Sequence, residues 1–211
     1  MAGLRAPFGR IALPSFPFVA GLKRRENFVK SAQKVDIECM PEFINLSRFN
    51  NSEFDRGASK LKEVLWILVR SVFFMPSLPL PSSLRVWWLR RFGAVVGEGV
   101  VIRSRVNITF PWRVSIGDYT WVGEEVLILS LASVDIGSHV CLSQRAFLCT
   151  GSHDFKKTSF DLITRPVTVN DHCWVSATAF VGPGSNVPTG TMVRAGEVVT
   201  SKTYPRVETQ D

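Results

Sequence analysis

The sequence predicts an all-β solenoid, a left-handed parallel β-helix of hexapeptide repeats with an N-terminal helical segment. Aliphatic residues recur at every sixth position between residues 96 and 199, with three interruptions. A small or β-branched residue follows four positions after most of them, and glycine often follows directly. Such a fixed period is typical of stacked repeats. The aliphatic positions are Val96, Ile102, Ile108, Ile116, Val122, Ile128, Ile136, Leu142, Leu148, Val169, Val175, Val181, Val187, Val193 and Val199.

Each hexapeptide is predicted to form one flat side of a triangular coil, with its aliphatic side chain pointing to the axis. Stacked coils pair their backbones and bury one continuous apolar core, so no coil is stable alone. Extra residues interrupt the period before Ile116, before Ile136 and between His153 and Val169. If each coil has three sides, all three insertions leave from one corner, where we expect the functional surface.

The repeat also sets the domain boundaries. The β-helix is predicted over residues 95–202, with an excursion loop at residues 154–168 and a short C-terminal tail at residues 203–211. Residues 1–42 are basic and proline-rich without a helix or strand period, so a disordered extension is predicted there. A start of translation at Met40 and a targeting segment are the other interpretations of this extension.

Residues 43–94 form the helical segment, with two predicted helices. The first starts after Ser59, and its aliphatic residues share one helix face. We expect this face to pack on the end of the β-helix. Attachment to a membrane surface is the alternative, because the helix is basic and aromatic. The second helix covers residues 83–92. The aliphatic face of the first helix consists of Leu61, Val64, Leu65, Leu68 and Val72, and its aromatic residues are Trp66, Phe73 and Phe74.

The chain length predicts one globular domain with an appendage, because 211 residues can bury a single stable core. The net charge of +7 favours an anionic partner, but no nucleic-acid-binding motif accompanies it, so nucleic acid is not expected. The four cysteines show no close pairs and no cleavable signal is evident, which favours the cytoplasm, with membrane association as an alternative. Charges and prolines interrupt the apolar stretch 61–80, so no transmembrane helix is expected.

His153 is the predicted chemical centre. It stands at the last position before the longest insertion, between Ser152 and Asp154. A histidine at such a corner can present a free imidazole nitrogen to a cleft and accept a proton near neutral pH. His139 and His172 occupy equivalent places in their own hexapeptides and are predicted to be polar turn residues.

Several motifs carry a resemblance to a known family. The run Leu148-Cys149-Thr150-Gly151-Ser152-His153-Asp154, followed by Val181-Gly182-Pro183-Gly184, resembles the hexapeptide-repeat acyltransferases. Further motifs are similar to the colanic acid biosynthesis acetyltransferase-like group, and the similarity extends from about Ile44 to Lys202. These motifs are Leu89-Arg90-Arg91-Phe92-Gly93-Ala94, Phe110-Pro111-Trp112, Ile116-Gly117-Asp118 and Leu142-Ser143-Gln144.

The resemblance implies an O-acetyltransferase that moves an acetyl group from acetyl-CoA to a sugar hydroxyl in polysaccharide biosynthesis. It further implies a homotrimer, with acetyl-CoA in the groove between neighbouring β-helices and His153 as the general base. Carried onto this sequence, the cofactor contacts are Trp174, Ser176, Ala177, Ala195, Thr200 and Lys202. The candidate acceptor contacts are Asp154, Glu124, Asp55 and Arg56.

Two other function classes fit the sequence less well. One is a catalytically silent, trimeric hexapeptide-repeat scaffold. The other is a metal enzyme of the γ-carbonic-anhydrase kind, in which His139, His172 and His153 would share a zinc ion, although their positions in the repeat argue against it. Cys149 is a candidate nucleophile, but it lies inside the repeat with no base placed beside it by the sequence, so an acyl-cysteine is not expected.

Overall fold

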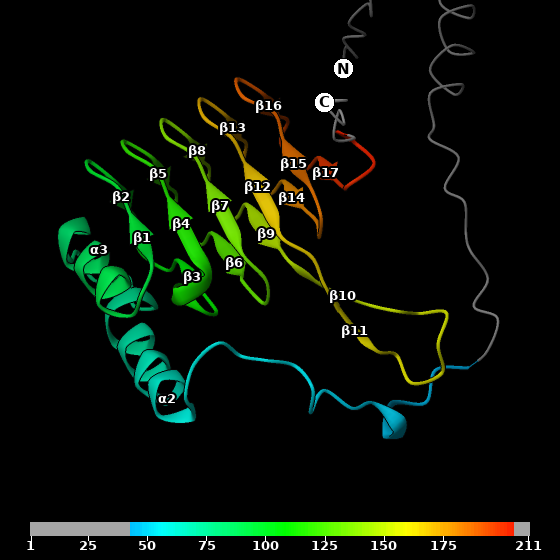
Figure 1. Ribbon diagram of the computed structural model, residues 1–211. Coiled ribbons are helices and arrows are strands. Elements are labelled where there is room, and N and C mark those ends of the chain that lie inside the picture. Colours follow the sequence, from blue (N-terminus) through cyan, green and yellow to red (C-terminus); the bar gives the residue numbers. More distant parts are fainter. Residues whose placement is uncertain (1–42, 205–211) are drawn as a thin grey trace, which may run out of the picture. The chain divides into compact units, whose positions relative to one another are not determined.

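The computed structural model describes residues 43–204, and this part of the chain contains the predicted left-handed β-helix (Figure 1). Three parallel sheets of five strands wrap around one axis. The first sheet consists of β1 (Val95–Val96), β4 (Val114–Ile116), β7 (Val134–Ile136), β12 (Val167–Val169) and β15 (Asn186–Val187). The second consists of β2 (Val101–Ile102), β5 (Trp121–Val122), β8 (Cys141–Leu142), β13 (Trp174–Val175) and β16 (Met192–Val193). The third consists of β3 (Asn107–Ile108), β6 (Leu127–Leu129), β9 (Phe147–Cys149), β14 (Phe180–Val181) and β17 (Val198–Val199).

The three sheets form a triangular prism, and the core lies inside it, as the repeat predicts. All fifteen aliphatic positions are buried, with exposed fractions between 0 and 8%. The strand register stacks them in columns, so that in the second sheet Ile102 pairs with Val122 and Val122 with Leu142. Each aliphatic side chain therefore packs on its equivalents one coil above and below, which buries a continuous apolar column.

All three insertions leave from the corner between the third and the first sheet, which confirms the sequence prediction. We call this edge the insertion corner. The first insertion contains the short 3-10 helix η4 (Pro111–Arg113), and the third forms a hairpin. In that hairpin, β10 (Gly151–His153) pairs antiparallel with β11 (Leu162–Thr164). The predicted excursion loop, residues 154–168, therefore contains a strand, β11, that pairs back on the residues before it.

Helices cover the end of the prism next to the first coil (Figure 1). After the short 3-10 helix η2 (Leu46–Arg48), α2 (Lys60–Val69) continues as the π-helix η3 (Arg70–Phe74), and α3 (Ser82–Arg91) follows. The hydroxyl of Ser59 caps α2 by accepting from the Lys62 amide. No helix among residues 43–204 combines the length and hydropathy that a membrane span requires.

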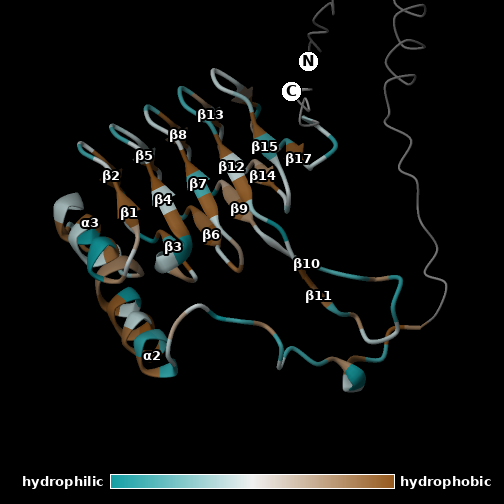
Figure 2. Ribbon diagram, in the orientation of Figure 1, coloured by the Kyte–Doolittle hydropathy of each residue, from teal (hydrophilic) through white to brown (hydrophobic). Residues whose placement is uncertain are grey.

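The predicted packing face of α2 is wrong. Its aliphatic residues are exposed by 46–69%, and the ribbon of α2 is largely brown in Figure 2 although it lies outside the prism. The opposite face packs instead, because the Trp66 indole is buried and donates to the carbonyl of Ile108 at 2.9 Å. Phe74 is also buried and contacts the Trp66 ring, while Phe73 is half-buried against Trp88. Aromatic burial thus fixes the orientation of the helix.

Candidate active site

The structure places His153 at the end of β10, on the hairpin of the insertion corner. Its Nδ1 lies 2.8 Å from the carbonyl oxygen of Phe160. Because a carbonyl only accepts, a neutral imidazole here carries its proton on Nδ1 and leaves Nε2 as an acceptor. The Phe160 ring stacks on the imidazole at 4.2 Å between centroids, and the Phe49 ring lies at 5.5 Å. These contacts hold the ring in one orientation.

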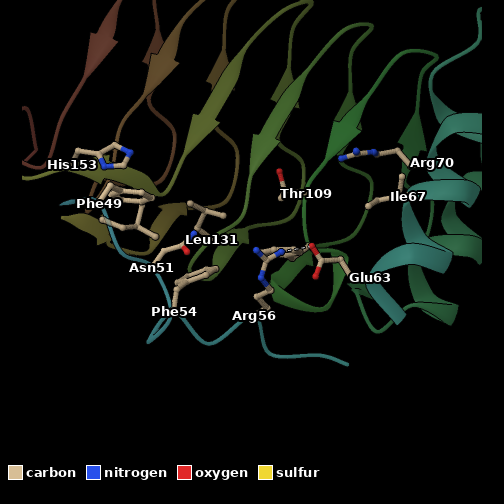
Figure 3. Close-up of a pocket in the computed structure, with 12 residues that line it drawn as sticks. Phe49, Asn51, Phe54, Arg56, Glu63, Ile67, Arg70, Thr109, Leu131 and His153 are labelled. Carbon is tan, nitrogen blue, oxygen red and sulfur yellow. Dashed lines mark hydrogen bonds and ion pairs between the residues drawn. The ribbon is translucent and has the colours of Figure 1, made fainter. Parts of the chain in front are cut away.

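One cavity of about 440 Å³ extends from His153 to the helices, and we call it the helix-side cavity. The segment 43–59 lines one side of it. This segment runs from the hairpin, where the Asn45 amide donates to the Thr158 carbonyl, to the start of α2. Figure 3 shows His153 and Arg70 at opposite ends, with the Arg56–Glu63 ion pair between them. Its lining consists of Phe49, Asn51, Phe54, Arg56, Glu63, Ile67, Arg70, Thr109, Phe110, Leu131, His153 and Leu162.

The charges in the helix-side cavity are unbalanced. Glu63 is its one lining acid, and Arg56 pairs with it at 2.5 Å. Arg70 is half-buried, and its Nη1 donates to Asn107 Oδ1 at 2.9 Å and to the Ile108 carbonyl at 3.4 Å, both neutral groups. Burial lowers the pKa of the Arg70 guanidinium, because desolvation disfavours its charge. Within residues 43–204, the remaining donors of Arg70 have no hydrogen-bond partner, so they are free to bind an anion.

A second cavity, of about 340 Å³, lies on the other side of the hairpin, and we call it the hairpin-side cavity. His153 borders it together with Asp154, Arg165, Phe180 and Thr200. The same residue, His153, therefore lines two cavities. This arrangement can bring two substrates to one general base.

The predicted cofactor contacts fall into two groups. Thr200 lines the hairpin-side cavity, and Lys202 lies in the turn that follows, with its amide donating to the Thr200 hydroxyl. The other four lie on β13 or at the corner between the second and the third sheet. There the Ala177 carbonyl accepts from Gly196, which follows Ala195. The two groups thus lie at the two different corners that border the third sheet, and one chain does not bring them together.

Two members of the second group have exposed or unsatisfied polar groups. Trp174 is 48% exposed, and its indole donates to the Ser143 hydroxyl at 2.8 Å. Ser176 is buried, and its hydroxyl has no hydrogen-bond partner among the described residues.

The predicted acceptor contacts are also divided. Arg56 lines the helix-side cavity and Asp154 lines the hairpin-side cavity. The Asp55 carboxylate accepts from the Gly57 amide within its own loop. Glu124 lies at the corner between the second and third sheets, bonded to the hydroxyl of Ser104, and borders neither cavity.

Sequence reasoning missed the helix residues of the site. Glu63, Ile67 and Arg70 line the helix-side cavity, and their spacing of four and three places them on one face of α2 and η3. That spacing was the available signal, but the aliphatic stripe on the opposite side of the helix is longer. Phe49 and Leu131 come from loops whose positions no local pattern predicts.

The other histidines lie at a different corner. His139 and His172 occupy left-handed turn positions with φ of 56° and 59°, and their rings stack at 5.0 Å. They connect the first sheet to the second, so one chain does not bring them to His153. Within residues 43–204, no three His, Cys, Asp or Glu side chains are grouped to hold a metal ion.

The structure also argues against Cys149 as a nucleophile. Its thiol is buried and donates to the carbonyl of Gly151 at 3.1 Å. Burial raises the pKa of the Cys149 thiol, which therefore stays protonated near neutral pH.

Comparison with known proteins decides the family. The chain is 39% identical over 151 residues to WcaF of Escherichia coli (strain K12), which is named as a colanic acid biosynthesis acetyltransferase. The match covers 72% of this chain and 83% of that protein. The chain belongs to the WcaF acetyltransferase family. The WcaF-like chain is also 23% identical over 138 residues to the galactoside O-acetyltransferase of the same organism, covering 64% of this chain and 68% of that one.

Solved structures confirm the fold of this WcaF-like acetyltransferase. A hexapeptide-repeat acetyltransferase of Vibrio cholerae O1 biovar eltor, complexed with acetyl coenzyme A, has a TM-score of 0.60 and 21% sequence identity. The alignment covers 68% of this chain and 80% of that one. No family model matches the chain.

Proposed function

We propose that this WcaF-like acetyltransferase transfers an acetyl group from acetyl-CoA to a sugar hydroxyl in polysaccharide biosynthesis, with His153 as the general base. The observation that carries the proposal is the single histidine that lines both cavities, with Nδ1 bound to a carbonyl and Nε2 left as an acceptor. The names of the relatives support acetyl transfer, and two of them name a polysaccharide pathway or a galactoside.

In the proposed step, Nε2 of His153 takes the proton of the acceptor hydroxyl as its oxygen attacks the thioester carbonyl carbon. The carbon–sulfur bond then breaks, and the imidazolium returns the proton to the leaving thiolate. The hydrogen bond from Nδ1 to Phe160 keeps the tautomer that this exchange needs. The acceptor is assigned to the helix-side cavity and the donor to the hairpin-side cavity, next to Thr200.

Donor binding between copies of a homotrimer would unite the two groups of predicted cofactor residues. Trp174, which is 48% exposed, would face the insertion corner of a neighbour from one copy, with Ser176 beside it. The second sheet exposes Trp121, Trp174 and Met192 in one outward row, a surface that a neighbouring copy can cover.

The free donors of Arg70 favour an acceptor with an anionic group, a carboxylate or a phosphate. If so, Arg70→Gln raises KM for a charged acceptor about tenfold, in line with the loss of one charge-assisted hydrogen bond. The value of kcat should change much less, because Arg70 lies at the far end of the cavity from His153. An equal change in KM for a neutral acceptor would contradict this role.

The direct test is a screen of nucleotide-linked and lipid-linked sugars with acetyl-CoA. We expect one acceptor class to gain the mass of a single acetyl group, with one free thiol released per product molecule. A protein that binds CoA but acetylates no sugar would instead support the silent scaffold. Stoichiometric zinc in the active protein would favour the metal enzyme. The cytoplasmic location stays a prediction.

A further inference from the structure

The outward face of α2 is an apolar stripe without a partner among the described residues. Its side chains lie opposite the face that contacts the prism through Trp66 and Arg70. The stripe is not a set of scattered residues, since four of them share one side of α2 and the fifth, Val72, follows in η3. It consists of Leu61, Val64, Leu65, Leu68 and Val72, exposed by 46–69%.

A stripe of this kind indicates a contact surface. Contiguous apolar patches on the surface of soluble proteins are rare and mark sites of protein or membrane contact. The buried side of the same helix contains charged groups, the ion-paired Glu63 and the half-buried Arg70. The helical segment therefore keeps Trp66 and these two charged groups against the protein, and its row of aliphatic side chains toward the outside. This is the reverse of the usual pattern of a surface helix.

The charge around the stripe favours an anionic surface. Residues 60–74 and 82–91 contain six cationic side chains, of which Arg70 lines the helix-side cavity and Arg85 is buried. Four cations remain against one acidic side chain, Glu63, which is paired with Arg56. Lys60, Arg90 and Arg91 are exposed. An amphipathic helix with basic residues around an aliphatic face is typical of proteins that lie on anionic lipid.

We propose that α2 docks on an anionic lipid bilayer, with its aliphatic stripe in the headgroup region. A second copy of the chain fits less well, because a ten-residue helix is only about 15 Å long and a stable interface buries about 800 Å² per partner. The excess of cations would also bring like charges together in such a pair.

Docking would place the proposed acceptor cavity beside the membrane. Glu63, Ile67 and Arg70 line that cavity from the opposite side of the same helical segment. The cavity would then lie about one helix diameter, about 10–12 Å, from the lipid surface. The docking proposal does not depend on the acetyl-transfer chemistry, since binding to lipid is measured without any substrate.

The test is sedimentation of the full chain with vesicles. Vesicles of phosphatidylglycerol and phosphatidylcholine should bind the protein, and vesicles of phosphatidylcholine alone should bind it more weakly. The double variant Leu65→Asp with Leu68→Asp should lose at least about tenfold in partition coefficient, because two buried leucines are replaced by charges. Lys60→Glu should lose about fivefold on the anionic vesicles.

The matched control is Val198→Asp. This valine is 61% exposed, close to the 58% of Leu68, and lies on β17 at the other end of the prism. Its variant should bind vesicles like the unmodified chain. The proposal is overturned if the unmodified chain does not bind anionic vesicles, or if the double variant binds equally well. A change of molecular mass in the double variant, measured without vesicles, would assign the stripe to a second copy and also overturn it.

Discussion

The prism interior and helix α2 both contain a regular row of aliphatic residues, in opposite surroundings. In the second sheet, Ile102, Val122 and Leu142 are buried with exposed fractions of 0–1%. On α2, Leu65 and Leu68 are about half exposed. Each interior residue has an equivalent in the next coil to pack on, whereas the stripe on α2 has none among residues 43–204. A regular spacing thus shows that residues share a face, but the partner of that face decides its burial.

Substitutions in the two rows should change the free energy of unfolding by clearly different amounts. Leu142→Ala leaves a cavity in the prism, and we expect it to lower the free energy of unfolding by about 2–5 kcal/mol. Leu68→Ala removes the same atoms from an exposed position and should change it by less than about 0.5 kcal/mol. Denaturant unfolding of both variants measures the difference. Equal losses would mean that the stripe is buried in the native protein.

A smaller effect is expected from the residue that orients α2. Trp66→Leu removes the hydrogen bond to Ile108 and the ring contact with Phe74. We expect a loss of about 1–3 kcal/mol in the free energy of unfolding. Trp87→Leu is the control, because Trp87 is half exposed on α3. If both variants lose the same amount, Trp66 does not anchor the helix.

The same comparison explains how far the sequence could be interpreted. The prism was predictable because each aliphatic residue packs on another member of the same repeat. The insertions were predicted at one corner because whole coils of three hexapeptides separate them. His153 was predictable from its position in the register. The pairing of Leu162 with His153 and the approach of Arg70 to Asn107 depend on contacts between distant segments, which have no local pattern.

The hydrogen bonds of Arg85 are a second set of contacts that no local sequence pattern predicts. It lies on the second predicted helix, where it is buried, and its guanidinium donates to the carbonyls of Phe73, Leu78, Leu80 and Ile102. A cation can be buried when backbone acceptors surround it. These acceptors belong to η3, to the turn before α3 and to β2, so only the folded chain brings them together.

The smallest expected effect concerns the buried thiols. Burial raises the pKa of Cys149 and Cys173 above the ordinary value of 9.0. In the unfolded chain these thiols ionise first, so the unfolded state binds fewer protons and stability falls as the pH rises above about 9. The slope is at most about 1.4 kcal/mol per pH unit for each thiol.

Unfolding of the Cys149→Ala and Cys173→Ala variants across this pH range should show a flatter decline than the unmodified chain. Cys141→Ala is the control for the loss of a cysteine as such, because Cys141 is only half-buried on β8. An unchanged slope in the first two variants would show that solvent reaches both thiols.

The most direct test of the central claim compares two histidines in the steady-state turnover of acetyl-CoA with the acceptor identified by the sugar screen. His153→Ala should lower kcat by about 10²–10⁴-fold, because it removes the general base. His172→Ala, at a different corner of the prism, should leave kcat within about twofold of the unmodified enzyme, as expected for an exposed turn residue. Turnover by His153→Ala at the rate of the unmodified chain, or an equal loss in His172→Ala, would contradict the assignment of His153 as the catalytic base.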